Sequence, residues 1–378
     1  MDTTFFSGQN YYSQFGGGLY NISSDPILNL HNGGTLFSAN FGFVTFVGNQ
    51  STGDAAGMYN TKSSPILNAV YFKDNRSDRD GGGLYNKDQS DPEINFCIFE
   101  NNYAGNYGGG MINNNSCNPE ISKTLFEDNY AGKRGGGLYN WSSCNPDMIN
   151  NAFESNESGQ VGGAMASYQS SPEITNAVFY NNTAEYRGAI ASTYQCGSKI
   201  TNATFFDNEA TKTDGGGALY AVTSWPTINN SAFYDNDNKD LRNVSSFVLG
   251  THNASDYGAS SVVNLGSGFV NLSGWDDDEV FGNPSDPSGF LPTGYFDLGA
   301  GLTPSACGPL VDAGTNSEIP SGVTNEMRNA FLVIPLPRIA GDIVDIGAYE
   351  MHIESDCEIP TAPGVHTSTD IVEQGGIS

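Results

Sequence analysis

Apolar residues recur along this chain in three kinds of short segment, separated by glycine, proline and asparagine. One segment reads Gly-Gly-x-Leu-Tyr, a second places an Ile just after a Pro, and a third ends in a Phe. None of them is long enough for a helix, and the i, i+3, i+4, i+7 spacing of an amphipathic helix is absent. The pattern therefore predicts units of three short β-strands.

The units repeat every 26–28 residues. A Phe column contains Phe46, Phe72, Phe99, Phe126, Phe153, Phe179, Phe205 and Phe233. Three residues after each Phe comes an Asn: Asn49, Asn75, Asn102, Asn129, Asn156, Asn182, Asn208 and Asn236. A third column contains Pro26, Pro65, Pro92, Pro119, Pro146, Pro172 and Pro226, with Ser198 in the one unit that lacks Pro. A unit this short cannot bury its own apolar face, so consecutive units must stack.

Stacking of such units predicts an all-β fold, a right-handed parallel β-helix of about eight regular coils with three short strands each. The Phe side chains then stack inside, and the corner Asn side chains pass hydrogen bonds from coil to coil. We expect the β-helix at 1–274, regular to about residue 240, and an acidic, Pro- and Gly-rich loop at 275–301. A capping module over the open C-terminal end at 302–357 and a linker tail at 358–378 complete the predicted organisation.

The first coil departs from the repeat. The spacing from Pro26 to Phe46 is 20 residues instead of seven, which indicates an excursion over about residues 30–44 that contains His31. Insertions in solenoids form loops on one face, often the binding face. The start of the chain has no signal-peptide pattern, and Phe5 and Phe6 resemble the end of a coil. We therefore expect a piece of a longer precursor, with further coils or another copy of the chain at this end.

Two motifs carry a resemblance to known proteins. Gly81–Asn86, repeated at Gly108–Asn113 and Gly135–Asn140, and the Phe-x-x-Asn units resemble motifs of chlamydial polymorphic outer membrane proteins and large bacterial surface β-helix proteins. The stretch Asp342–Glu350, Asp-Ile-Val-Asp-Ile-Gly-Ala-Tyr-Glu, resembles a module that follows such helices in secreted bacterial proteins. The resemblance implies a secreted or cell-surface protein of bacterial type and says little about activity.

Charge narrows the classes of partner. The chain has 42 Asp and Glu against 15 Lys and Arg, a net charge of −27, which argues against nucleic acid and anionic membrane surfaces. No apolar run approaches the ~18 residues of a membrane span. An acidic run offers candidate Ca²⁺ ligands, with a solvated loop as the alternative. These residues are Asp276, Asp277, Asp278 and Glu279.

A tyrosine column is the candidate glycan-binding surface. It contains Tyr20, Tyr59, Tyr85, Tyr139 and Tyr220, each next to an inward Leu or Met, so alternation directs the rings outward. Outward rings either stack on sugars, together with His31 of the excursion, or only shield the strand backbone. Both interpretations are compatible with the column.

The turns before the glycine pairs carry mixed charge. Arg79 and Asp80 lie in one coil, and Lys133 and Arg134 lie two coils on. Glu185 and Arg187 lie two coils beyond those, and stacking places all of these residues along one edge of the solenoid. A polysaccharide lyase uses such groups, because a base removes a proton while a cation neutralises the uronate. A solvated turn has the same composition. The chain also lacks the Gly-His-Gly, Arg-x-Lys and Arg-x-Pro-x-x-Arg signatures of polygalacturonases and pectate lyases.

Two cysteine pairs are candidate disulfides. Cys117 and Cys144 occupy one column in adjacent coils, so their Cα atoms should lie ~4.8 Å apart, inside the disulfide range. Cys307 and Cys357, which flank the predicted capping module, are a weaker pair. No cysteine or histidine spacing suggests zinc.

Three functions remain compatible with this sequence. The favoured one is a non-catalytic surface protein, an adhesin or appendage component, that binds a glycan or a partner protein through its side wall. The alternatives are a polysaccharide lyase or hydrolase on the same scaffold, and a structural stalk or filament subunit. The fold does not choose among them, because β-helices serve all three purposes.

Overall fold

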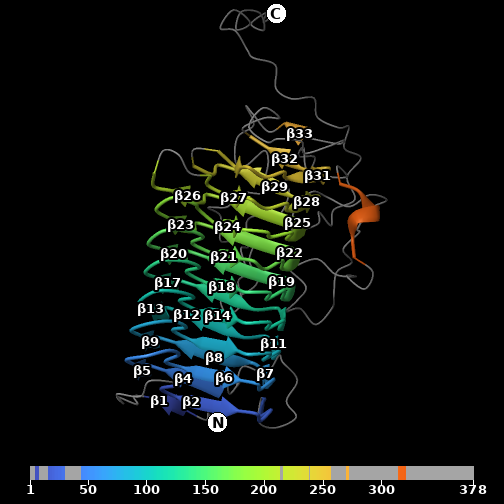
Figure 1. Ribbon diagram of the computed structural model, residues 1–378. Helices are drawn as coiled ribbons and strands as arrows, with labels where there is room; N and C mark the ends of the chain where they lie inside the picture. Colours follow the sequence, from blue (N-terminus) through green and yellow to red (C-terminus); the bar gives the residue numbers. More distant parts are fainter. Residues whose placement is uncertain are drawn as a thin grey trace, which may run out of the picture.

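The computed structural model describes residues 5–7, 16–29, 44–212, 216–237, 239–256, 270–271 and 314–320. These ranges contain 33 strands and one short 3₁₀ helix, η2 (Asn316–Glu318), which lies beside the stack. Equivalent strands of successive coils pair in parallel and stack along one axis, as Figure 1 shows. The predicted parallel β-helix is confirmed.

The Gly-Gly-x-Leu-Tyr segments form a nine-stranded sheet. Tyr59, Tyr85 and Ile112 are register partners in successive strands, so residues at equivalent positions of the sequence repeat lie next to each other in the sheet. The strands are β2 (Leu19–Ile22), β6 (Met58–Thr61), β10 (Leu84–Lys87), β14 (Met111–Asn114), β18 (Leu138–Trp141), β21 (Met165–Tyr168), β24 (Ile190–Thr193), β27 (Leu219–Val222) and β30 (Leu241–Val244).

The segments after the Pro column and before the Asn column form one seventeen-stranded sheet. Its strands are β1 (Phe5–Ser7), β3 (Ile27–Leu28), β4 (Val44–Val47), β7 (Ile66–Asn68), β8 (Val70–Lys73), β11 (Glu93–Asn95), β12 (Ile98–Glu100), β15 (Glu120–Ser122), β16 (Leu125–Glu127), β19 (Asp147–Glu154), β22 (Glu173–Tyr180), β25 (Lys199–Phe206), β28 (Thr227–Asn229), β29 (Ala232–Tyr234), β31 (Leu249–Thr251), β32 (Ala254–Ser255) and β33 (Val270–Asn271). Within a coil, one left-handed residue, such as Ala69 (φ 55°) or Asn176 (φ 51°), separates the two segments. The second and third predicted strands of each unit therefore share a sheet.

A third sheet, of seven two-residue strands, was not predicted. Its strands are β5 (Gln50–Ser51), β9 (Arg76–Ser77), β13 (Tyr103–Ala104), β17 (Tyr130–Ala131), β20 (Glu157–Ser158), β23 (Thr183–Ala184) and β26 (Glu209–Ala210). Each strand directly follows a residue of the Asn column. Two residues are too few for their sequence to show an alternating pattern.

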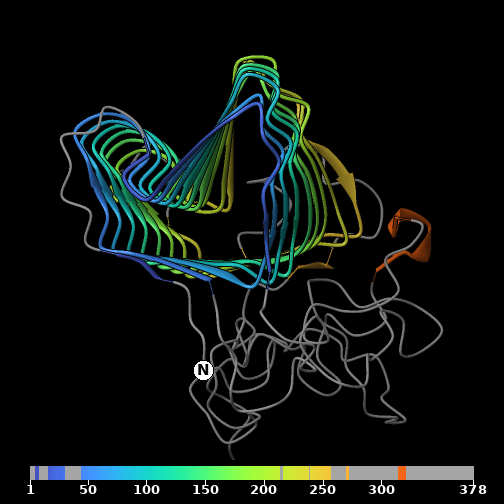
Figure 2. The ribbon, with the colours of Figure 1, turned by 90° about the horizontal axis from the view of Figure 1, so that it is seen from below.

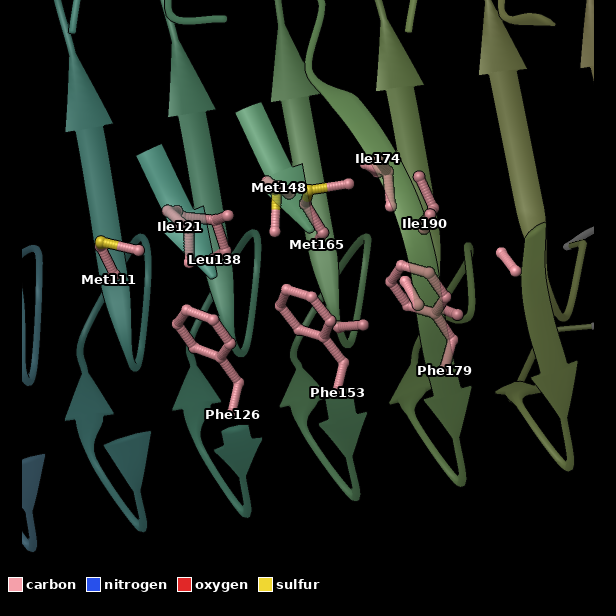
Figure 3. Close-up of a cluster of buried hydrophobic side chains, with 14 of the residues drawn as sticks. Met111, Ile121, Phe126, Leu138, Met148, Phe153, Met165, Ile174, Phe179 and Ile190 are labelled. Carbon is pink, nitrogen blue, oxygen red and sulfur yellow. The ribbon is translucent and has the colours of Figure 1, made fainter. Parts of the chain in front are cut away.

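The Phe column forms the centre of the core. All eight rings are fully buried, and their centroids lie 4.6–5.2 Å apart in seven stacked pairs. Figure 3 shows Phe126, Phe153 and Phe179 in a row, with Leu138 and Met165 from the nine-stranded sheet near them. Each such aromatic contact adds ~0.5–1.5 kcal/mol beyond simple burial.

The Asn column forms the predicted hydrogen-bonded ladder. Each Nδ2 donates to Oδ1 of the Asn one coil further on, at 2.8–3.0 Å, from Asn49 to Asn236. The same Nδ2 also donates to a Phe carbonyl of the previous coil, as Asn129 does to Phe99 at 2.7 Å. The ladder thereby satisfies backbone carbonyls at the corner where the chain leaves the seventeen-stranded sheet.

A second buried ladder lies inside the nine-stranded sheet. It links Asn21, Asn60, Asn86, Asn113 and Asn140 through Nδ2–Oδ1 bonds of 2.8–2.9 Å. These asparagines follow the Tyr column by one residue, so alternation turns their side chains into the solenoid. They are therefore part of the core.

The described part of the predicted capping module touches the flank of the solenoid. Glu318 Oε2 accepts a hydrogen bond from Asn229 Nδ2 at 2.8 Å, and the backbone of Thr315 exchanges two hydrogen bonds with the Asn230 amide. These contacts attach 314–320 beside the end of β28 (Figure 1). The predicted boundaries at 274, 301 and 357 fall outside the described residues and stay predictions.

Candidate functional site

The tyrosine column is not the exposed stripe that we expected. Tyr59, Tyr85 and Tyr139 point away from the Phe core, as alternation predicts, yet each is only 3% exposed. Tyr20 is exposed and Tyr220 is half-buried. Three of the five tyrosines in the column therefore cannot offer a ring face to a sugar in this structure.

A lobe of each coil covers these rings. Seen along the axis in Figure 2, the chain leaves the seven-stranded sheet, turns back and enters the nine-stranded sheet, so that the turn lies against that sheet's outer face. Ala55 and Val161 of these turns pack with Tyr85 and Tyr139 in a second apolar cluster outside the main core. Alternation predicts the face of a strand, but not what covers that face.

Other rings lie at least partly exposed on the same outer face, two of them two residues further along β18 and β21 and the third directly after β24. Trp141, Tyr168 and Tyr194 lie in three successive coils and form the row that we call the outer aromatic row. Trp141 and Tyr168 are register partners, and Tyr168 stacks on Tyr194 with centroids 5.4 Å apart. Trp141 is 38% and Tyr194 48% exposed. For Trp141 and Tyr168 the sequence signal was present, because i and i+2 share a face of a strand, but this position has no constant residue type and Tyr194 lies beyond its strand.

A pocket of about 370 Å³ lies beside this row. Its walls come from the lobe turns and from β27 and β30. The residues that line it are Arg134, Gln160, Val161, Tyr186, Arg187, Tyr220 and Arg242. Arg134 lies 5.9 Å from the ring centroid of Tyr168, which connects the pocket to the outer aromatic row.

Arginine is concentrated in this pocket by strand register. Arg134, Val161 and Arg187 are bridge partners in successive coils, which confirms that Arg134 and Arg187 share one edge. Arg242 pairs with Tyr220 in the nine-stranded sheet. Burial lowers the pKa of Arg187, and the positive charge of Arg134 lowers that pKa further. The two guanidinium groups are therefore close enough to repel each other.

The other candidate catalytic residues are dispersed. The Arg79 side chain, which is largely exposed, pairs with Asp54 at 3.5 Å. Asp80 is 7% exposed, and burial, reinforced by the negative charge of Asp54, raises the pKa of its carboxyl to about 6. Lys133 lies over the Tyr107 ring, at 5.6 Å. Asp80 is two coils from Arg134, so the four residues do not converge on one point.

The thiols of Cys117 and Cys144 are adjacent and free in the structure. Both are fully buried, and the Cys117 backbone N–H donates to Cys144 Sγ at 3.2 Å. A hydrogen bond from the Cys117 thiol to Cys144, together with burial, raises the pKa of Cys117. The predicted adjacency is correct, and the disulfide itself stays a prediction.

Several candidate residues lie outside the described residues: His31, the acidic run Asp276–Glu279, Cys307 and Cys357. Among the residues that are described, no three His, Cys, Asp or Glu side chains group to hold a metal ion. The described part of the chain also contains no helix with the length and hydropathy of a membrane span.

Comparison with known proteins bears on the fold. Residues 58–237, nearly half of the chain, match a protein family described as "Right handed beta helix region". No curated protein and no solved structure matches the chain. The matched residues run from β6 through β29, and all strand pairs among them are parallel. The regular coils thus form a right-handed parallel β-helix.

Proposed function

We propose that this protein is a secreted or cell-surface β-helix protein that binds a glycan along its side wall without cleaving it. The supporting observation is the outer aromatic row, Trp141, Tyr168 and Tyr194, which runs along the axis next to a polar pocket. Partly exposed rings in successive coils present apolar faces that stack on sugar rings.

The spacing of the row suits an extended polymer. Successive coils repeat at ~4.8 Å, so each coil offers equivalent groups to the next stretch of a linear ligand. Because the wall of a solenoid is rigid, most of the conformational entropy that is lost on binding is lost by the ligand. This arrangement favours many weak contacts over one deep site.

Catalysis has less support than binding. The candidate acid Asp80 is buried and two coils away from Arg134. Glu185, which is two residues before Arg187, pairs with Lys212 at 3.7 Å. A lyase needs its base and its charge-neutralising group within reach of one sugar unit. The arginines alone supply charge and no evident base.

A glycan array followed by titration calorimetry tests the proposal. We expect binding to at least one polysaccharide, weakened about tenfold by Trp141→Ala combined with Tyr194→Ala. The matched control is Trp225→Ala, because Trp225 is also 48% exposed but precedes Pro226 at another corner. This control should change affinity less than about twofold.

Two results would overturn the proposal. One is the absence of binding to every polysaccharide tested. The other is release of unsaturated or reducing ends from a bound polysaccharide, abolished by Lys133→Gln and Arg134→Gln but not by the aromatic substitutions. The second result would replace a binding protein with a lyase.

A further inference from the structure

The arginine-lined pocket is unusual in so acidic a chain. Of 15 Lys and Arg residues against 42 Asp and Glu, three arginines line one pocket of about 370 Å³. None of its lining residues is acidic. If charged residues were distributed at random over a surface with net charge −27, we would expect carboxylates beside these guanidinium groups.

Arg134 and Arg187 also make no ion pair within the described residues. Glu185, only two residues before Arg187, pairs instead with Lys212 at 3.7 Å. Arg187 lies over the Tyr220 ring at 4.2 Å, and Arg134 lies near Tyr168. Aromatic rings hold both guanidinium groups in place, and Arg134 and Arg187 also hydrogen-bond to the hydroxyls of Tyr139 and Tyr220. A guanidinium has several N–H donors, so the remaining N–H groups can bind an oxyanion.

We propose that this pocket binds the carboxylate or sulfate group of an acidic sugar, so that the ligand of the side wall is a glycan with acidic residues. Guanidinium groups bind planar carboxylates and tetrahedral sulfates through paired, charge-assisted hydrogen bonds. The aromatic rings of Tyr186 and Tyr220 line the same pocket and can contact the sugar that bears the anion. The inference rests on the proposed function, because the outer aromatic row would bind the rest of the glycan.

The net charge of the protein restricts which acidic glycans fit. The net charge of −27 repels a densely charged anionic polymer, but this repulsion is screened beyond ~8 Å at physiological ionic strength. Two guanidinium groups in one pocket act on a single anion at short range. The fitting ligand therefore carries isolated acidic sugars between neutral ones.

Monosaccharides test the pocket independently of the wall. Glucuronate, glucose 6-sulfate and glucose are titrated by NMR into the wild-type chain, the pair Arg134→Gln/Arg187→Gln and a control pair. The control, Arg76→Gln/Lys62→Gln, also removes two positive charges, here at exposed positions, and Arg76 likewise lies over a tyrosine, Tyr103, at 3.8 Å. Both acidic sugars should bind the wild type and the control, and bind the pocket variant about tenfold more weakly.

Polymers connect the pocket to the wall. Partly esterified pectin, which has isolated carboxylates, should bind more tightly than fully esterified pectin, and this difference should vanish in Arg134→Gln/Arg187→Gln. The variant Arg134→Lys/Arg187→Lys, which keeps the charge, should retain part of the preference. Melting curves of all variants show whether each is folded, and the lysine pair substitutes for the glutamine pair if that one is not.

The outcomes separate the two proposals. If both pectins bind equally, and the substitutions at Trp141 and Tyr194 weaken both, the wall binds glycans and the anion inference is wrong. If the acidic monosaccharides bind through the arginines but no polymer binds, the anion site is correct and the wall function is wrong. Equal binding of acidic sugars by the wild type and the folded arginine variants also overturns the inference.

Discussion

The side-chain amide of Asn236 donates a hydrogen bond to the carboxyl of Asp240, at 2.9 Å. Asn236 is the last member of the Asn column, so the carboxyl of Asp240, the residue directly before β30, takes the place of the next asparagine. Asp240 is buried, and it also accepts a hydrogen bond from the Ser255 hydroxyl. The ladder thus ends on an acidic side chain that is buried away from solvent.

Asp240 should make stability depend on pH. Burial, followed by repulsion from Asp256, raises the pKa of Asp240 to about 8. Since an unfolded Asp titrates near ~3.9, the folded chain holds an extra proton between these values. The contribution of Asp240 to stability is therefore fully present below pH ~4 and is lost as the pH rises through 8.

Asp240→Asn tests this dependence by urea unfolding between pH 6.5 and 9. We expect the free energy of unfolding of the wild type to fall over this range and that of Asp240→Asn to stay flat, a difference on the order of 2 kcal/mol at pH 9. Asp80→Asn is the control, because the pKa of Asp80 is raised only to about 6. Parallel curves for wild type and Asp240→Asn would contradict the assignment.

Asn129→Ala should destabilise the solenoid. Asn129 is fully buried, donates to Phe99 O and Asn156 Oδ1, and accepts from the side chain of Asn102 at 2.9 Å. Truncation leaves these partners without hydrogen bonds inside the core, at a cost of about 3 kcal/mol by urea unfolding. Asn118→Ala, at an exposed position, should cost less than about 1 kcal/mol. Equal stability of both variants would mean that the ladder contributes nothing.

Gly109→Ala should be among the most damaging small substitutions. A Cβ at Gly109 would overlap the carbonyl oxygens of Gly136 and Tyr130 from the next coil. Relief requires the coils to move apart, which should cost about 3 kcal/mol. Gly48→Ala has open space around the new methyl group and costs only the strain of its φ of +65°, about 1 kcal/mol. Thermal melts that rank Gly48→Ala as the worse variant would refute the steric argument.

Tyr85→Ala should lower stability rather than only weaken a binding surface. Tyr85 is buried in the second apolar cluster, and its hydroxyl accepts a hydrogen bond from Asn114 at 2.8 Å. The loss should reach about 3 kcal/mol, against about 1 kcal/mol for Tyr85→Phe, which removes the hydroxyl alone. Chemical denaturation of the two variants gives this comparison, and an unchanged Tyr85→Ala would show that the lobe does not pack on the sheet.

Cys117 and Cys144 should join under oxidising conditions, while Cys97 and Cys196 should stay reduced. The first two thiols are adjacent in one column, and the hydrogen bond from Cys117 lowers the pKa of the Cys144 thiol, which favours its reactive thiolate. Cys97 has no such partner thiol, and burial raises its pKa to about 12. Non-reducing peptide mass spectrometry should find one Cys117–Cys144 bond. Alkylation of all four thiols in the denatured, oxidised protein would exclude it.

The sequence predicted the interior better than the surface. Identical residues at one period must stack, so the repeat alone placed the Phe and Asn columns inside the solenoid. The burial of Tyr59 and Tyr85 under the turns of the lobe could not be predicted, because the alternation of residues in a strand contains no information on where the connecting turns lie. Arg134 and Arg187 were correctly placed on one edge. Arg242 was missed, since the repeat decays after Asn236 and no column includes it.

The side-chain amide dipoles of the two buried asparagine ladders are aligned along the axis of the solenoid. In both, each side-chain amide donates one N–H to the Oδ1 of the next asparagine toward the C-terminus, from Asn49 to Asn236 and from Asn21 to Asn140, so the amide C=O groups point toward the N-terminal coils. The ladder from Asn202 through Asn176 runs the other way and offsets only part of this alignment. Aligned amide dipoles add head to tail, as they do in a helix. One end of the stack therefore favours negative partners, so two copies of such a solenoid are not interchangeable when joined head to head or head to tail.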